Sequence, residues 1–162
     1  MSINIVIEDL KIVEKIVFNI KIVPLPWKVG TVYANKNSRV TKFGNAQKAN
    51  MAPSKQNDQF KKTFASQALK YAPSSRSERL KSAILLCFDF HLPRPKGNTD
   101  INALPLADSD LTNLQKLAED ALTKKFWNDD NQVINIVSNK SYIKPEGEKP
   151  SITTYVYYVE KE

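Results

Sequence analysis

The sequence has little of the residues that form cross-links or soft-metal sites, since its 162 residues include one cysteine, Cys87, and one histidine, His91. A lone cysteine forms no disulfide within the chain and is more typical of a small buried hydrophobe. One histidine is too few for a histidine-based zinc site, and it leaves a Ser-His-Asp triad hard to build. The N-terminus also lacks the pattern of a signal peptide. We therefore expect a cytoplasmic protein without disulfides.

Long apolar runs are missing as well. The best candidate, residues 83–90, already contains Asp89 and falls far short of the ~20 residues that a membrane-spanning helix requires. The chain is nevertheless 41% hydrophobic, with nine prolines and only four glycines, a composition typical of a folded protein. A chain of this length has room for one core, so we predict a single domain over residues 1–162 and no membrane partner.

Positive charge is concentrated in one part of the chain. Residues 28–96 contain fourteen basic and three acidic side chains, a net charge of +11, whereas residues 97–162 carry −4 and the whole chain carries +7. Such a basic block is typical of proteins that bind nucleic-acid backbones, because each neutralised phosphate releases condensed counterions. A merely solvated surface is the alternative, and the charge alone does not decide between the two.

Hydrophobic spacing predicts the elements of the first half of the chain. Two β-strands are expected within residues 3–7 and 17–23, before the proline-containing segment 24–28 interrupts the pattern. Residues 29–55 are rich in Asn, Lys, Ser and Gln, and we interpret them as a flexible basic arm. Apolar residues at helical spacing then predict an amphipathic helix over residues 56–71.

The second half continues with a strand, a helix and two more strands. Residues 82–92 alternate so that five apolar side chains share one face, which predicts a central strand. Helical spacing returns over residues 112–125. Two β-rich runs follow, 132–138 and 152–159, and we expect them to form an antiparallel pair. The predicted fold class is α/β (α+β), a small mixed β-sheet packed by two main helices.

Four aspartates flank the second predicted helix: Asp108 and Asp110 precede it, and Asp129 and Asp130 follow it. Gathered carboxylates hold hard cations, which polarise a phosphate and lower the pKa of an attacking water. A helix of about 14 residues is ~21 Å long, so the two pairs meet only if the chain after the helix folds back. Each pair also has a structural interpretation, because aspartates cap helices and the segment Asn128-Asp-Asp-Asn131 is typical of a polar turn.

Two further residues at this helix are candidates with alternatives of their own. Thr112 begins a Thr-x-x-Gln pattern and is a rival helix cap. Lys116, one turn later, could stabilise charge on a transferred phosphate or be an ordinary solvated lysine.

Candidates elsewhere are weaker. Asp89 and His91 share one face of their strand and could ligate a metal, although we favour a hydrogen-bonded couple at the sheet end. Trp27 and Trp127 stand beside charged loops, where they could stack on unpaired bases or pack in the core.

Taken together, the residues from Asp110 onward resemble the RusA family of Holliday junction resolvases, small homodimeric endonucleases of phage and prophage origin. The family motif reads Asp-x-Asp-Asn-Leu-x-Lys, then Asp-Ala-Leu ending a helix, an aromatic residue, and an Asp-Asp pair before Gln-Val or Gln-Ile. This chain has Asp110-Leu-Thr-Asn-Leu-Gln-Lys116, Asp120-Ala-Leu122, Phe126-Trp127, Asp129-Asp130 and Gln132-Val133. Earlier segments match more loosely, and residues 1–16 are extra, consistent with an added edge strand or an altered dimer contact.

The resemblance implies that Asp110, Asp129 and Asp130 bind Mg²⁺, for which Mn²⁺ could substitute, and that Lys116 is catalytic together with Asp110 and Asp130. The motif's second aspartate falls on Thr112, whose hydroxyl can coordinate magnesium but adds no charge. Asp108 and Glu119 are the candidates to supply the missing carboxylate. From the basic block and the resemblance together, we expect DNA contacts from Lys28, Arg94, Lys96, Lys116 and Lys140.

The function that the resemblance implies is magnesium-dependent resolution of four-way DNA junctions by paired symmetric cuts, performed by a homodimer in the cytoplasm of a bacterial or phage-infected cell. No small-molecule cofactor is expected. Two alternatives stay open: a branched-DNA-binding protein with attenuated or no cleavage because of Thr112, and a less specific flap or single-strand nuclease. A scaffold unrelated to nucleic acid is the remaining alternative, and binding insensitive to salt would be its mark.

Overall fold

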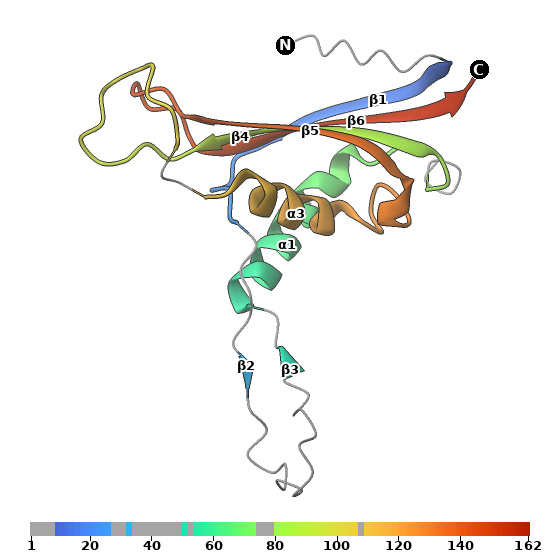
Figure 1. Ribbon diagram of the computed structural model, residues 1–162, viewed down its shortest axis with the longest axis horizontal. Coiled ribbons are helices and arrows are strands. Elements are labelled where there is room, and N and C mark those ends of the chain that lie inside the picture. The colour runs from blue at the N-terminus through green and yellow to red at the C-terminus, as the bar shows by residue number, and fades with distance from the viewer. Residues whose placement is uncertain (1–8, 27–31, 34–49, 52–53, 74–79, 107–108) are drawn as a thin grey trace, which may run out of the picture.

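A four-stranded mixed sheet with two α-helices packed on one face forms the body of the molecule (Figure 1). The computed structural model describes residues 9–26, 32–33, 50–51, 54–73, 80–106 and 109–162. This α+β arrangement confirms the predicted fold class. Among these residues no helix is both long and apolar enough to cross a membrane.

The sheet consists of β1 (Leu10–Ile20), β4 (Ala83–Leu92), β5 (Val133–Tyr142) and β6 (Ser151–Lys161), in the order β1-β6-β4-β5. β6 runs antiparallel to both β1 and β4, whereas β5 is parallel to β4. The predicted antiparallel pairing of the last two strands is therefore wrong. Helix α3 (Leu111–Leu122) carries the chain from the end of β4 back to the start of β5, and such a crossover makes β4 and β5 parallel.

The core lies between the sheet and the helices. β4 turns the side chains of Ile84, Leu86, Phe88, Phe90 and Leu92 to the helices, and all five are buried, as the alternation predicted. The apolar stripes of both helices pack against them: Phe60, Phe64, Ala65 and Ala68 from α1 (Lys55–Ala68), and Leu114, Leu117, Ala118, Ala121 and Leu122 from α3.

The bounds of several elements differ from the predictions. A single strand, β1, replaces the second of the two N-terminal strands, and the first lies outside the described residues. The first helix ends with the 3₁₀ turn η1 (Leu69–Tyr71), and α3 stops three residues before the predicted end. Of the predicted arm 29–55, two short strands, β2 (Val32–Tyr33) and β3 (Asn50–Met51), pair antiparallel. Most of the remaining arm lies outside the described residues.

Candidate functional site

The first group of predicted site residues lies at the N-terminal end of α3. Asp110 is the N-cap, and its Oδ1 accepts hydrogen bonds from the backbone N–H and the hydroxyl of Thr112, each at 3.0 Å. Thr112 is thus inside the helix, and its interpretation as a rival cap is wrong, because Asp110 already satisfies the exposed backbone donor. Both side chains are exposed to solvent.

Strand β5 brings a basic residue, Lys140, to the N-terminal end of α3. Its direction, opposite to that of α3, places Lys140 beside the residue before the cap, so that Nζ donates to the carbonyl of Ser109 at 2.9 Å. One turn along the helix, Ser138 Oγ donates to Gln115 Oε1 at 2.9 Å. The chain after the helix does fold back to the N-terminal end of α3. The residues that it brings there are Ser138 and Lys140 of β5, not Asp129 and Asp130.

The second group lies beyond the C-terminal end of α3, on a tight loop anchored in the core. Lys124 adopts a positive φ of 69°, which turns the chain sharply after the helix. Phe126 and Trp127 follow and are fully buried, and the buried hydroxyl of Tyr158 donates to the carbonyl of Phe126 at 3.0 Å. Trp127 therefore packs in the core and is not placed to stack on a base. Its burial fixes the position of the two aspartates that come next.

Local hydrogen bonds hold both of these aspartates. Asp129 caps the 3₁₀ turn η2 (Asp130–Gln132) and accepts from the N–H of Asn131 at 3.1 Å, while Gln132 closes a capping box. Asp130 Oδ1 accepts from the hydroxyl of Thr123 at 2.9 Å. Thr123 is the C-cap of α3, so Asp130 is held at the end of that helix. Both aspartates are exposed to solvent.

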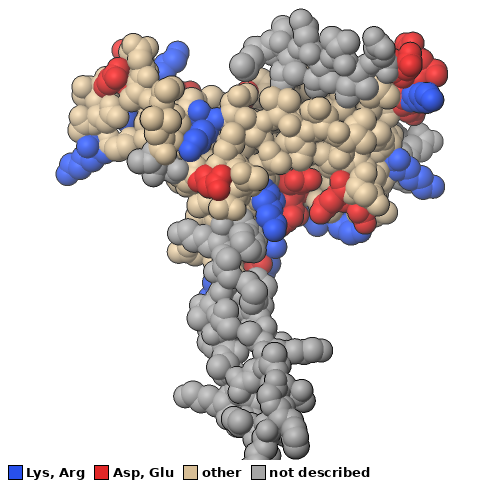
Figure 2. Space-filling model, in the orientation of Figure 1, with Lys and Arg blue, Asp and Glu red and all other residues tan. Residues whose placement is uncertain are grey.

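A cluster of three carboxylates forms at this end, made of Glu119, Asp120 and Asp130. Burial, followed by repulsion from Asp130 and Asp120, raises the pKa of Glu119 to about 7. The pKa of Asp120 is also raised, mainly by burial and then by Asp130, although Lys61 and Lys116 oppose the shift. Figure 2 shows acidic and basic side chains side by side over the region that α3 and the following loop occupy in Figure 1. The C-terminal end of α3 therefore carries three neighbouring carboxylates, with the positive charges of Lys61 and Lys116 close to Asp120.

Sequence reasoning treated Glu119 only as a substitute for Thr112 and gave Asp120 no role. The available signal was helical spacing: Thr112, Lys116 and Asp120 follow one another at intervals of four and form one row along the helix surface. That row connects the two ends of α3. Whether Asp130 would join it depended on a loop whose path the sequence did not reveal.

Within a single chain, the two groups of predicted metal ligands lie apart, at opposite ends of α3. Helix α3 has 12 residues, which makes it about 18 Å long, with Asp110 and Thr112 at one end and Asp129 and Asp130 beyond the other. Within the part of the chain that the structure describes, no three acidic, histidine or cysteine side chains converge closely enough to hold one metal ion. The three clustered carboxylates are thus near enough to repel one another but do not form a closed metal cage.

The other candidates lie elsewhere or have structural partners. Asp89 accepts from Asn139 Nδ2 at 3.2 Å, and His91 Nδ1 lies 3.4 Å from Ser141 Oγ, so each residue has its partner on the adjacent strand β5. Cys87 is buried. Trp27, Lys28 and Asp108 lie outside the described residues.

The loop after β4 contains two predicted DNA contacts, Arg94 and Lys96. Arg94 forms hydrogen bonds within the protein. Its guanidinium donates to the carbonyls of Ile143 and Asp100 and lies over the ring of Tyr142. Arg94 therefore fastens the loop to the end of β5, whereas Lys96 is exposed.

Comparison with known proteins identifies the class to which this fold and site belong. A sequence model of the family described as Endodeoxyribonuclease RusA matches residues 30–153, most of the chain. No curated protein matches the chain. The chain belongs to the RusA endodeoxyribonuclease family, and it is on this basis a nuclease of DNA. β1 precedes the matched region and forms one edge of the sheet.

Proposed function

We propose that the protein is a magnesium-dependent endonuclease that resolves four-way DNA junctions by paired symmetric cuts. The observation that carries this proposal is the pair of exposed acidic groups at the two ends of α3, Asp110 before it and Asp129-Asp130 after it, in a chain of the RusA endodeoxyribonuclease family. Lys116 lies on the helix between them and is exposed.

The donor set suits magnesium. Mg²⁺ prefers oxygen ligands and usually keeps several waters, taking one or two carboxylates from the protein and the rest from substrate phosphates. Asp110, Asp129 and Asp130 offer exposed carboxylates, and Thr112 a neutral hydroxyl. When bound, the ion would polarise the scissile phosphate and lower the pKa of the attacking water.

The chain's own residues would position the DNA and oppose its charge. Lys116, on the exposed surface of α3, would stabilise the negative charge that develops on the transferred phosphate. Lys140 and Lys96 would bind flanking phosphates, together with Lys28, whereas Arg94 would support the loop that carries Lys96. Asp110 and Asp130 would hold the ion in place.

A homodimer accounts for the separation of the ligand groups. Since one chain holds Asp110 and Asp130 at opposite ends of α3, we propose that a site combines Asp110 of one protomer with Asp130 of its partner. The loop before α3 exposes three large apolar side chains, Ile101 at 65%, Leu104 at 71% and Leu106 at 83%. A contact there would bury them, and its two-fold symmetry would match that of a four-way junction.

Cleavage of a synthetic four-way junction, with Mg²⁺ and with EDTA, tests the proposal. Asp110→Asn and Asp130→Asn should each lower the cleavage rate at least a hundredfold and leave junction binding within about threefold of wild type, because each removes a ligand without changing its shape. Glu160→Gln, exposed at the outer end of β6 opposite Lys11, is the matched control and should cut normally. Normal cutting by either ligand variant would contradict the assignment.

The same assay separates the alternatives. Junction binding without cutting at any magnesium concentration would favour a binding protein in which Thr112 has cost activity. Equal cutting of flaps or unbranched duplex would favour a less specific nuclease.

A further inference from the structure

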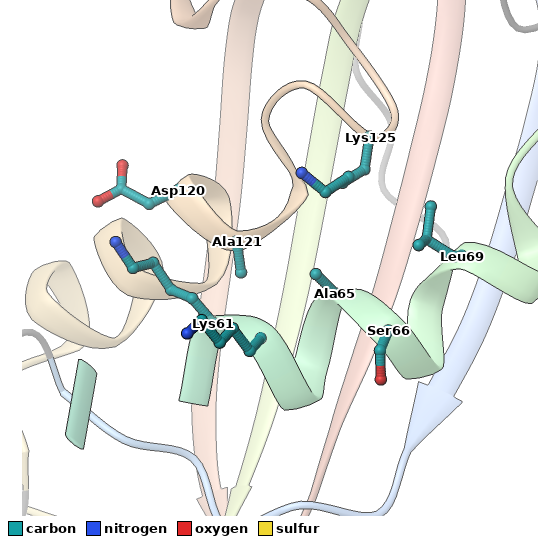
Figure 3. A pocket seen from close by; sticks show the side chains of 8 residues that line it. Lys61, Ala65, Ser66, Leu69, Asp120, Ala121 and Lys125 are labelled. Atoms are coloured by element: carbon teal, nitrogen blue, oxygen red, sulfur yellow. The ribbon is translucent and has the colours of Figure 1, made fainter. Parts of the chain in front are cut away.

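A groove runs between α1 and α3, with a volume of about 320 Å³. Its floor is apolar and consists of Ala65, Leu69 and Ala121. Figure 3 shows Lys61 reaching in from α1 and Lys125 from the loop after α3, with Asp120 on the α3 side. The groove therefore ends at the carboxylate cluster described above. Its α3 side includes Asp120 and Ala121 of the family motif, whereas its α1 wall lies outside that motif.

The lining carries an excess of positive charge. Of the residues that the structure describes, three lysines border the groove, Lys61 and Lys62 from one wall and Lys125 from the other, against one carboxylate, that of Asp120. Ser66 adds an exposed hydroxyl to the α1 wall. The ion pair between Lys61 and Asp58 is solvent-exposed and long, at 3.5 Å. Exposed pairs of this kind contribute little, so a phosphate could replace Asp58 at small cost.

The groove also lacks the features that read bases. Among the residues that the structure describes, no aromatic side chain lines it, and aromatic rings are the usual platforms on which unpaired bases stack. Lysines with a small apolar floor instead suit a sugar–phosphate backbone, which is charged on its phosphates and apolar on its sugar edges. The charge complementarity favours a polyanion over any apolar partner.

We propose that this groove binds the backbone of a DNA strand beside the carboxylate cluster, with Lys61, Lys62 and Lys125 contacting successive phosphates independently of base sequence. This inference rests on the proposed nuclease function and adds to it a backbone-binding surface on α1. The strand would lie against both helices and pass Asp120 on its way to Asp130.

The salt dependence of junction binding tests the groove. Each phosphate contact that is lost lowers the slope of log affinity against log salt by about 0.9. Lys61→Ala/Lys125→Ala should therefore weaken binding of a four-way junction in EDTA about tenfold or more and reduce that slope by about 1.8. Lys61→Arg/Lys125→Arg should keep both values near wild type.

A matched control removes the same charge far from the groove. Lys11 and Lys161 are exposed at the outer end of the β1–β6 pair, and Lys11 stands seven residues before Phe18, the β1 residue that packs against α1. Seven strand residues span about 23 Å. Lys11→Ala/Lys161→Ala should leave the slope unchanged, and an equal loss in both double variants would overturn the proposal in favour of a general charge effect.

Ser66 allows the groove to be blocked without removing a lysine. Ser66→Glu places a negative charge in the groove and should weaken junction binding at least fivefold relative to the neutral Ser66→Gln. If wild type binds and cuts junctions while the Ala/Ala and Glu variants match it, the groove proposal fails and the nuclease remains. If wild type neither binds nor cuts junctions and a polyanionic peptide occupies the groove instead, both proposals fail.

Discussion

Thr112 is the residue at which this chain departs from the motif of its family. Its hydroxyl and backbone N–H both bond to the carboxylate of Asp110, so the two side chains already form a single oxygen-bearing unit at the start of α3. A hydroxyl can reach a cation but does not neutralise it. Compared with the Asp-x-Asp of the motif, this end of α3 therefore carries one negative charge fewer.

Replacing Thr112 by aspartate should restore that charge. We expect Thr112→Asp to raise the apparent magnesium affinity of junction cleavage about tenfold, or ~1.4 kcal/mol, because a second carboxylate beside Asp110 attracts the ion. Magnesium titrations of the cleavage rate measure this, and the neutral Thr112→Asn is the control. An unchanged magnesium midpoint in the aspartate variant would show that position 112 lies outside the metal shell.

The carboxylate cluster at the end of α3 should make stability depend on pH. Folding raises the pKa of Glu119 from 4.5 to about 7, chiefly through burial. The folded state then holds a proton that the unfolded chain has lost, so stability decreases as pH rises from about 4.5 to about 7 and levels off above. Packing at the end of this helix therefore costs stability chiefly because it desolvates the Glu119 carboxylate, with a smaller cost from repulsion by Asp130 and Asp120.

Glu119→Gln should remove this pH dependence. In EDTA, the Tm of the variant should exceed that of wild type at pH 8 by a few degrees. The difference should shrink as the pH falls to 4.5 and below, where the unfolded wild type also takes up the proton. Thermal unfolding followed by circular dichroism measures it. The exposed Glu146→Gln is the control, with an equal Tm difference at both pH values. A constant difference for Glu119→Gln would contradict the pKa argument.

Most elements could be predicted from the sequence because their apolar periodicity is strong. The alternation from Ile84 to Leu92 and the helical stripe of α3 both point to the core that the structure contains. Pairing could not be predicted, because the pattern of β5 and β6 shows which faces are buried but not which strand lies beside which. The insertion of β6 between β1 and β4 depends on contacts across the whole sheet and not on the local pattern of β6.

The candidate site was predictable as residue types but not as an arrangement. The motif from Asp110 to Lys116 indicated a nuclease. In the structure Asp110 is the N-cap of α3, as aspartates before a helix often are. The distance between Asp110 and Asp130 depends on the loop at Lys124 and on the anchoring of Trp127, which no local pattern encodes. Asp120 was missed because a half-buried acid on a helix is indistinguishable in sequence from a solvated one.

At the scale of the assembly, a shared active site makes a strict prediction. Co-expressed Asp110→Asn and Asp130→Asn chains should regain about a quarter of wild-type nicking, because half of the dimers are mixed and each mixed dimer has one site with both aspartates. Two differently tagged copies of Asp110→Asn are the control. If each site lies within one chain, the mixture stays inactive.

The exposed apolar loop before α3 should control the proposed dimer. Leu104→Asp/Leu106→Asp places charges on side chains that are 71% and 83% exposed, so the fold should be kept while a contact that buries them is lost. Analytical ultracentrifugation should show a shift from dimer to monomer, and cleavage should fall with it. The control is Lys11→Asp/Lys161→Asp on the far end of the sheet. A double variant that remains dimeric would locate the contact elsewhere.

The position of β6 also determines when the molecule can fold. Its contacts with β1 join residues far apart in the chain, such as Asn19 and Ser151, 132 positions apart, which is a high contact order and slows folding. At typical rates of synthesis, β1 waits on the order of ten seconds on the ribosome before its partner emerges. Until then β1 and β4 both present open strand edges to the cell, so the nascent chain passes through its most aggregation-prone state just before the sheet closes.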